Sequence, residues 1–141
     1  MSSTDDPFDP NNWDLTPYPR RVYLDDKAET FVLVDEIDYQ WALQWRWHIN
    51  KPHAKRNGKK LYACRSQGGG GRYKPKLYLH VEIMKRTGII PPTPDFIIVD
   101  HRDGKELNCT RTNLRWATPR MNRMNLNGAY PTDLLDRMLE T

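Results

Sequence analysis

Apolar residues in the first third of the chain change spacing twice, which predicts a β-hairpin, a helix and a strand in that order. The strand-forming residues of Arg21–Leu24 and the apolar run in Thr30–Val34, on either side of the polar step Asp25-Asp26-Lys27, predict a β-hairpin. Helical spacing of tryptophans then predicts a helix over Asp35–Gln44 with its tryptophan face in the core. Apolar and polar residues alternate in Trp45–Ile49, which predicts a strand.

The middle of the chain predicts a second hairpin and a helix. A basic segment, Lys51–Lys60, contains the turn dipeptide Asn57-Gly58 and is followed by the apolar return strand Leu61–Arg65. Beyond a glycine-rich loop, Lys76–Tyr78 is typical of a strand and His80–Arg86 of a short helix that ends at Gly88.

The most informative stretch begins with a strand, Phe96–Val99, that ends at Asp100 and His101. An Asp-Gly turn follows, then a second strand, Leu114–Ala117. Thr118-Pro119 then predicts a helix start, because threonine caps free N–H groups and proline needs none at the first position. This strand–loop–strand–helix order brings Asp100 and Asn122 together as two oxygen ligands for one metal ion, with an imidazole beside them. A terminal amphipathic helix is expected over Tyr130–Leu139.

Length and composition indicate a small α+β protein. The chain has 141 residues, of which 38% are hydrophobic and 28% charged, so we expect one domain with short tails. No apolar run approaches a membrane span and the acidic N-terminus is unlike a signal peptide, so we expect an intracellular protein without a membrane partner. Cys64 and Cys109 form no CxxC pair and are expected to be reduced. We divide the chain into a flexible acidic arm (1–18), an antiparallel β-rich region (19–77), a motif core (78–126) and a C-terminal helix or tail (127–141).

Charge is distributed unevenly along the chain. Residues 1–50 contain 4 Lys and Arg against 10 Asp and Glu, whereas residues 51–125 contain 17 against 5. A polyanion bound to this basic block would release condensed counterions, the main source of affinity for nucleic acid. A solvated basic face without a partner is the alternative. We expect double-stranded DNA as the partner, with contacts from the β-rich region and the motif core. The predicted DNA-binding residues are Lys51, Lys55, Arg56, Lys59, Lys60, Arg65, Arg72, Lys74, Lys76, Arg115, Arg120 and Arg123.

The motif stretch resembles a known nuclease family. Asp100-His101, Asn113 twelve positions later and Asn122 nine further on are similar to the motif of HNH endonucleases, the ββα-metal finger. The likeness is greatest to phage- and intron-encoded HNH homing endonucleases and covers about Tyr78 to Asn125. A weaker likeness extends it from Val34 to Ala63. The segments and residues that match the family motif are Leu79-His80, Val99-Asp100-His101, Asp103-Gly104, Asn113-Leu114-Arg115-Trp116, Thr118-Pro119, Asn122 and Asn125.

The resemblance implies a metal-dependent DNA endonuclease that leaves a 5′-phosphate and a 3′-hydroxyl. Asp100 and Asn122 would hold one divalent cation, Mg²⁺ or Mn²⁺ rather than Zn²⁺, because both ligands are hard oxygens. His101 would take a proton from the attacking water. Asn113 would tie the motif loop together, and His80 would either pack against the finger or act in catalysis. One site cuts one strand, so a monomer would nick and a double-strand break would need a dimer or a second event.

Such an enzyme would act in the cytoplasm of a bacterial host and would be phage-encoded. Two other classes stay open. One is a non-catalytic DNA-binding module that keeps the finger as a scaffold, and the other is a structural protein-interaction role in phage assembly.

Overall fold

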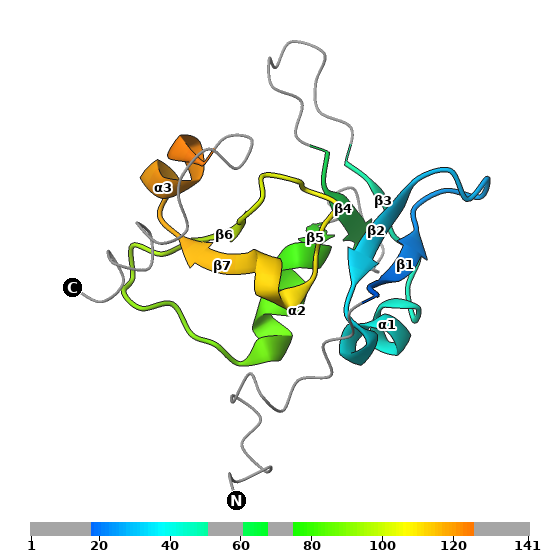
Figure 1. The fold of residues 1–141 in the computed structure, drawn as a ribbon, viewed down its shortest axis with the longest axis horizontal. Coiled ribbons are helices and arrows are strands. Elements are labelled where there is room, and N and C mark those ends of the chain that lie inside the picture. The colour runs from blue at the N-terminus through cyan, green and yellow to red at the C-terminus, as the bar shows by residue number, and fades with distance from the viewer. Residues whose placement is uncertain (1–17, 51–60, 68–74, 126–141) are drawn as a thin grey trace, which may run out of the picture.

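The computed structural model describes residues 18–50, 61–67 and 75–125, which form three α-helices and several short antiparallel strands (Figure 1). This arrangement confirms the α+β class. None of the helices in these ranges has the length and apolar character needed to cross a membrane. The acidic arm and the helix expected over Tyr130–Leu139 lie outside the described residues.

In chain order the elements are β1 (Arg20–Tyr23), β2 (Phe31–Val34), α1 (Glu36–Ala42), β3 (His48–Ile49), β4 (Ala63–Ser66), β5 (Lys76–Tyr78), α2 (Leu79–Thr87), β6 (Ile98–His101), the 3₁₀ turn η2 (Arg111–Asn113), β7 (Leu114–Ala117) and α3 (Pro119–Met124).

The N-terminal hairpin forms as predicted, with β1 antiparallel to β2. Asp25 closes its turn by accepting hydrogen bonds from the backbone N–H groups of Glu29 (2.9 Å) and Thr30 (3.0 Å). Alternate residues of β2, Val32 and Val34, are fully buried. The hairpin therefore presents one apolar face to the rest of the molecule.

The second sheet has the order β3-β4-β5 and confirms a hairpin around the basic segment, which itself lies outside the described residues. Its first strand is shorter than the predicted Trp45–Ile49. The N–H groups of Gln44 and Trp45 bond back to carbonyls of α1, so the chain is still turning there and cannot pair with a strand. Trp47 is buried beneath this turn and donates a 2.8 Å hydrogen bond from Nε1 to Ala42 O.

The motif stretch differs from its prediction in one strand. The sequence predicts Phe96–Val99, whereas β6 runs two residues later and includes both Asp100 and His101. Turn bonds from Phe96 N to Thr93 O and from Ile97 N to Asp95 O occupy the earlier residues. β6 pairs antiparallel with β7, and Thr118 caps α3 by accepting from Met121 N as predicted. Asp100 and His101 therefore point to opposite faces of a two-stranded sheet.

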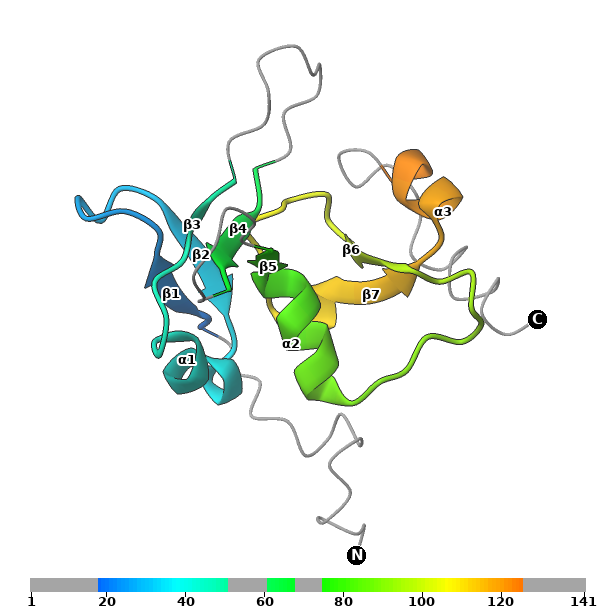
Figure 2. The same cartoon turned by 180° about the vertical axis from the view of Figure 1, so that it is seen from behind.

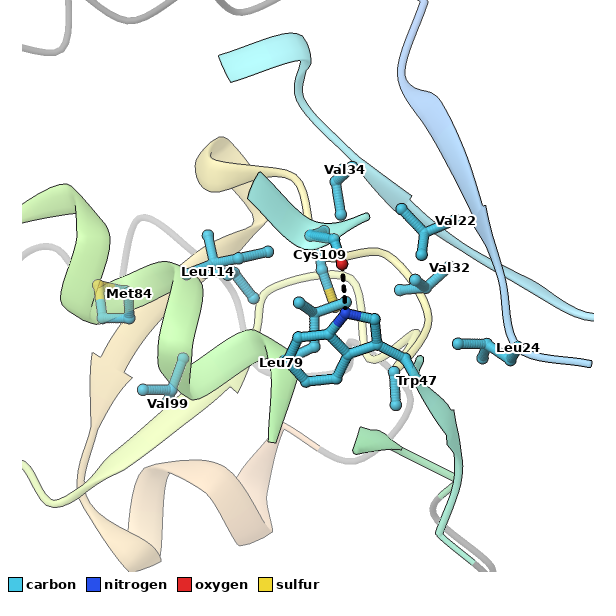
Figure 3. Packing of buried hydrophobic residues seen from close by; sticks show 13 residues of the cluster. Val22, Leu24, Val32, Val34, Trp47, Leu79, Met84, Val99, Cys109 and Leu114 are labelled. Carbon is cyan, nitrogen blue, oxygen red and sulfur yellow. Dashed lines mark hydrogen bonds between the residues drawn. The ribbon is translucent and has the colours of Figure 1, made fainter. Parts of the chain in front are cut away.

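One hydrophobic core joins the two halves of the chain. Helix α2 lies between the β1–β2 hairpin with α1 on one side and β6–β7 with α3 on the other (Figures 1 and 2). Figure 3 shows Trp47, Leu79 and Cys109 between the hairpin valines and a group formed by Val99 and Leu114. The division expected near residue 78 falls where β5 leads directly into α2, and it does not separate two cores.

A buried ion cluster ties α1 to the motif loop. The fully buried carboxylate of Asp38 accepts hydrogen bonds from Arg111 Nε (2.9 Å) and Arg111 Nη2 (2.8 Å), and a third from Arg86 Nε (2.9 Å). The two bonds from one planar guanidinium are the bidentate geometry that fixes orientation as well as charge. This cluster joins α1, α2 and η2.

We expect Asp38→Asn to lower the free energy of unfolding by about 3–5 kcal/mol, because removing one partner leaves buried charges uncompensated. Urea unfolding followed by tryptophan fluorescence measures the change. Glu36→Gln on the same helix is the matched control, since Glu36 pairs with Arg20 at the surface, where water and salt screen the interaction. If Asp38→Asn and Glu36→Gln lower the free energy of unfolding equally, the buried cluster is no more stabilising than the surface ion pair.

Candidate functional site

Asp100 lies in β6 with its carboxylate enclosed by the next strand and helix. Asp100 Oδ2 accepts a hydrogen bond from Arg115 Nε on β7 (3.0 Å) and another from Asn125 Nδ2 (2.9 Å). Arg115, one of the predicted DNA-binding residues, is itself buried, with 4% of the residue exposed. Its role in the structure is to pair with the Asp100 carboxylate, directly across the β6–β7 ladder.

Asn125, which ends α3, fastens that helix to β6. Its side-chain Nδ2 donates to Asp100 Oδ2 and to the backbone carbonyl of His101, each at 2.9 Å. The sequence places Asn125 on one helix face with Asn122 and among the positions that match the HNH motif, but it assigns no function to this residue. Asn122, three positions earlier on α3, is half-buried, and the helical spacing predicts that it shares this face.

His101 faces the opposite side of β6 and is buried. Its Nε2 lies 3.9 Å from Cys109 Sγ, and its ring centroid lies 4.8 Å from that of His80 and 6.0 Å from that of Tyr62. The sequence predicts an imidazole directed at a bound phosphate. In the structure 4% of the residue is exposed, so the ring is held in an aromatic cluster and any reactant has to approach a nearly covered group.

His80, from the first turn of α2, packs inside this cluster. Its ring stacks on Tyr62 (5.0 Å between centroids) and packs at a tilt of 45° against His101. Burial, with a smaller contribution from His101, lowers the pKa of His80 from 6.5 to about 3. A neutral His80 ring therefore packs against His101 near neutral pH.

The loop between β6 and β7 is organised by Asn113. Its Oδ1 accepts from Asp103 N (3.0 Å), and its Nδ2 donates to Asp103 Oδ1 (3.0 Å) and to Asn108 O (2.8 Å). These are the bonds expected of a loop-tying amide. The Asp35 carboxylate anchors the same loop from the N-terminal half by accepting from Arg111 N (2.7 Å).

The predicted DNA-binding residues are only partly described. Arg120 and Arg123 are exposed on α3, and Lys76 is exposed on β5 with its Nζ donating to Asn50 Oδ1 (2.9 Å). Arg65 is half-buried, with its guanidinium 4.3 Å from the ring centre of Trp45. The other predicted DNA-binding residues lie outside the described part of the chain, namely Lys51, Lys55, Arg56, Lys59, Lys60, Arg72 and Lys74.

The oxygen donors at β6 and α3 suit a hard cation better than a soft one. Among residues 18–50, 61–67 and 75–125 no three His, Cys, Asp or Glu side chains are grouped to hold a metal ion. A cation here would depend on the Asp100 carboxylate, the Asn122 amide oxygen and water. Ligand carboxylates are themselves usually hydrogen-bonded, as Asp100 is to Arg115 and Asn125.

Comparison of the chain with protein-family models, curated proteins and solved structures finds no match in any of the three.

We expect the protein to lose stability as the pH falls from 7 to 5. The pKa of His80 is lower in the folded chain (about 3) than in the unfolded chain (6.5), so its contribution is complete above pH 6.5 and is lost progressively below it. At about 1.4 kcal/mol per pH unit, the loss between pH 6.5 and 5 is about 2 kcal/mol. Urea unfolding at several pH values measures it.

In that experiment His80→Phe removes the contribution, while the exposed His48→Phe serves as the control and keeps the native slope. A native pH dependence unchanged by His80→Phe would show that other groups cause it.

Proposed function

We propose that the chain is a metal-dependent DNA endonuclease of the HNH type that nicks one strand. The observation that carries the proposal is the bond pair from Asn125 to Asp100 and to the His101 carbonyl, which sets α3 against β6. Asn122 precedes Asn125 by three positions on the same helix, so we expect its side chain to face the strand that holds Asp100 and His101. The order β6, loop, β7 and α3 is the order expected of a ββα-metal finger.

Each side chain has a distinct part in this chemistry. Asp100 and Asn122 would hold Mg²⁺ or Mn²⁺, which supplies neutralisation of the anionic phosphodiester and of the leaving 3′-oxygen. His101 accepts the proton of the attacking water. Its Nε2 lies 3.9 Å from Cys109 Sγ. Hydrolysis leaves a 5′-phosphate and a 3′-hydroxyl.

The exposed cations around this site match a polyanionic substrate. Arg120 and Arg123 project from α3, the helix that carries Asn122, and Lys76 lies on the sheet that precedes α2. The basic segment 51–60 enters and leaves the described structure at β3 and β4. Phosphates bound by Arg120 and Arg123 would lie beside the helix that carries Asn122.

A second candidate is a non-catalytic DNA-binding module, and one observation favours it. His101 is almost completely covered by His80, Tyr62 and Cys109, whereas a general base has to reach its water. The two candidates share the DNA partner and differ only in whether the imidazole reaches a reactant, so one assay separates them.

We expect the native chain to nick supercoiled plasmid in the presence of Mg²⁺ or Mn²⁺, and His101→Ala to reduce the rate by about 10²–10⁴-fold, the usual contribution of a positioned general base. Asn122→Ala should have a comparable effect, because the variant lacks one ligand for the cation. The rate of conversion of supercoiled to open-circular DNA measures both, and end-labelling identifies the 5′-phosphate.

His48→Ala is the matched control, because His48 is exposed on β3 and takes no part in the proposed chemistry. Unfolding curves show whether each variant is folded. DNA binding without nicking by the native chain favours the non-catalytic module. A stable protein complex and no DNA affinity favour the interaction role instead.

We further expect the double variant Arg120→Gln, Arg123→Gln to weaken binding to duplexes of any sequence. Each lost arginine–phosphate ion pair should reduce the slope of log affinity against log salt by about 1, so the double variant should reduce it by about 2. Fluorescence anisotropy at a series of NaCl concentrations measures the slope. Lys85→Gln is the control, since Lys85 is exposed on α2 beside Glu82 and is not among the predicted DNA-binding residues. The same slope in the double variant and the control would remove α3 from the DNA-binding surface.

A further inference from the structure

Tyr62, which the sequence alone does not assign to the site, belongs to a triangle of rings around His101. Its centroid lies 5.0 Å from that of His80, with ring planes 24° apart, and 6.0 Å from that of His101, with planes 28° apart. His80 and His101 complete the triangle at 4.8 Å. Each imidazole is thus packed against the other and against the same phenol ring, and the three rings come from three separate parts of the chain.

The position of Tyr62 is set by the second sheet and not by β6. Its carbonyl accepts a 2.8 Å bond from Asn50 N, and the next residue, Ala63, pairs with Ile49 across β3 and β4. On the side of β5 the ring of Tyr78 meets it edge-on, with 5.9 Å between centroids. The phenol ring therefore enters the cluster from a fixed backbone, so it can act as a rigid wall for the imidazole.

Burial and nearby negative charge keep the Tyr62 phenol protonated and uncharged. Burial, followed by the charges of Glu106 and Asp100, raises the pKa of Tyr62 to about 12. The ring is half-buried and uncharged under ordinary assay conditions. A phenylalanine at this position would keep the stacking surface and remove only a neutral hydroxyl.

From this geometry we propose that Tyr62 is a positioning residue that holds the His101 imidazole in the orientation needed for proton transfer. The effect of Tyr62 on catalysis rests on the proposed nuclease function, whereas its effect on the orientation of the His101 ring does not. Cys109 limits the ring on the Nε2 side, while Tyr62 and His80 limit its tilt. Loss of the phenol wall would let the imidazole rotate within the cluster, and even small misplacement of a reacting group is costly to rate.

Nuclear magnetic resonance of the full chain, without added metal and at one fixed pH, tests the ring orientation directly. In the native chain we expect cross-relaxation between ring protons of Tyr62 and His101, and ring-current shifts of the His101 protons. Tyr62→Phe should keep those shifts and Tyr62→Leu should lose them. Tyr39→Leu is the matched control, a half-buried tyrosine on α1 outside the ring cluster.

Plasmid nicking tests the consequence. We expect Tyr62→Leu to lower kcat by about 10–100-fold with KM unchanged, Tyr62→Phe to restore most of the rate, and Tyr39→Leu to leave kcat near native. No Tyr62–His101 cross-relaxation in the native chain overturns the proposal even if Tyr62→Leu does not fold. So does a Tyr62→Leu variant that folds and keeps native shifts and kcat. Absence of nicking by the native chain, with the expected spectra, refutes the nuclease function and leaves the ring orientation established.

Discussion

The carboxylate of Asp38 is fully buried, and the motif loop is built on it. Two bonds from Arg111 and one from Arg86 satisfy its charge, so the loop between β6 and β7 cannot move away from α1 without exposing uncompensated ions. Backbone pairing strengthens the same junction, because Leu33 of β2 bonds to both Leu107 and Cys109 at 2.8 Å. The N-terminal half is therefore part of the support of the candidate site.

That support extends to each side chain of the site. On one face of β6, Arg115 and Asn125 hold the Asp100 carboxylate and draw α3 against the strand. On the other face, rings from the second sheet and from α2 surround His101. Precise placement of reacting groups needs such a packed surround. The same packing that holds the His101 imidazole in place also covers it and limits the approach of a reactant.

Several elements are predictable because their causes are local. The turn between β1 and β2 is closed by Asp25 within the turn itself, and α2 ends at Gly88 with φ of 75°, a left-handed conformation that glycine adopts readily. Thr118 and Pro119 start α3 by capping chemistry alone. The start of β6 differs from its prediction because turn bonds at residues 93–97 and pairing with β7 decide where that strand begins.

Neighbours within a few positions are enough to specify the hairpins, the helix ends, the strand–loop–strand–helix order and the residue types of the candidate site, so the amino-acid sequence predicts all of these. Long-range packing is what buries Arg115 against Asp100, joins Asn125 of α3 to β6, and stacks Tyr62 on His101. The first two pairs are 15 and 25 positions apart, and the third joins the second sheet to the motif stretch. Spacing along the chain does not encode these pairs, because they arise only when separate elements bury their apolar faces together, in the main core or in the smaller cluster of Ala117 and Met121 beneath α3.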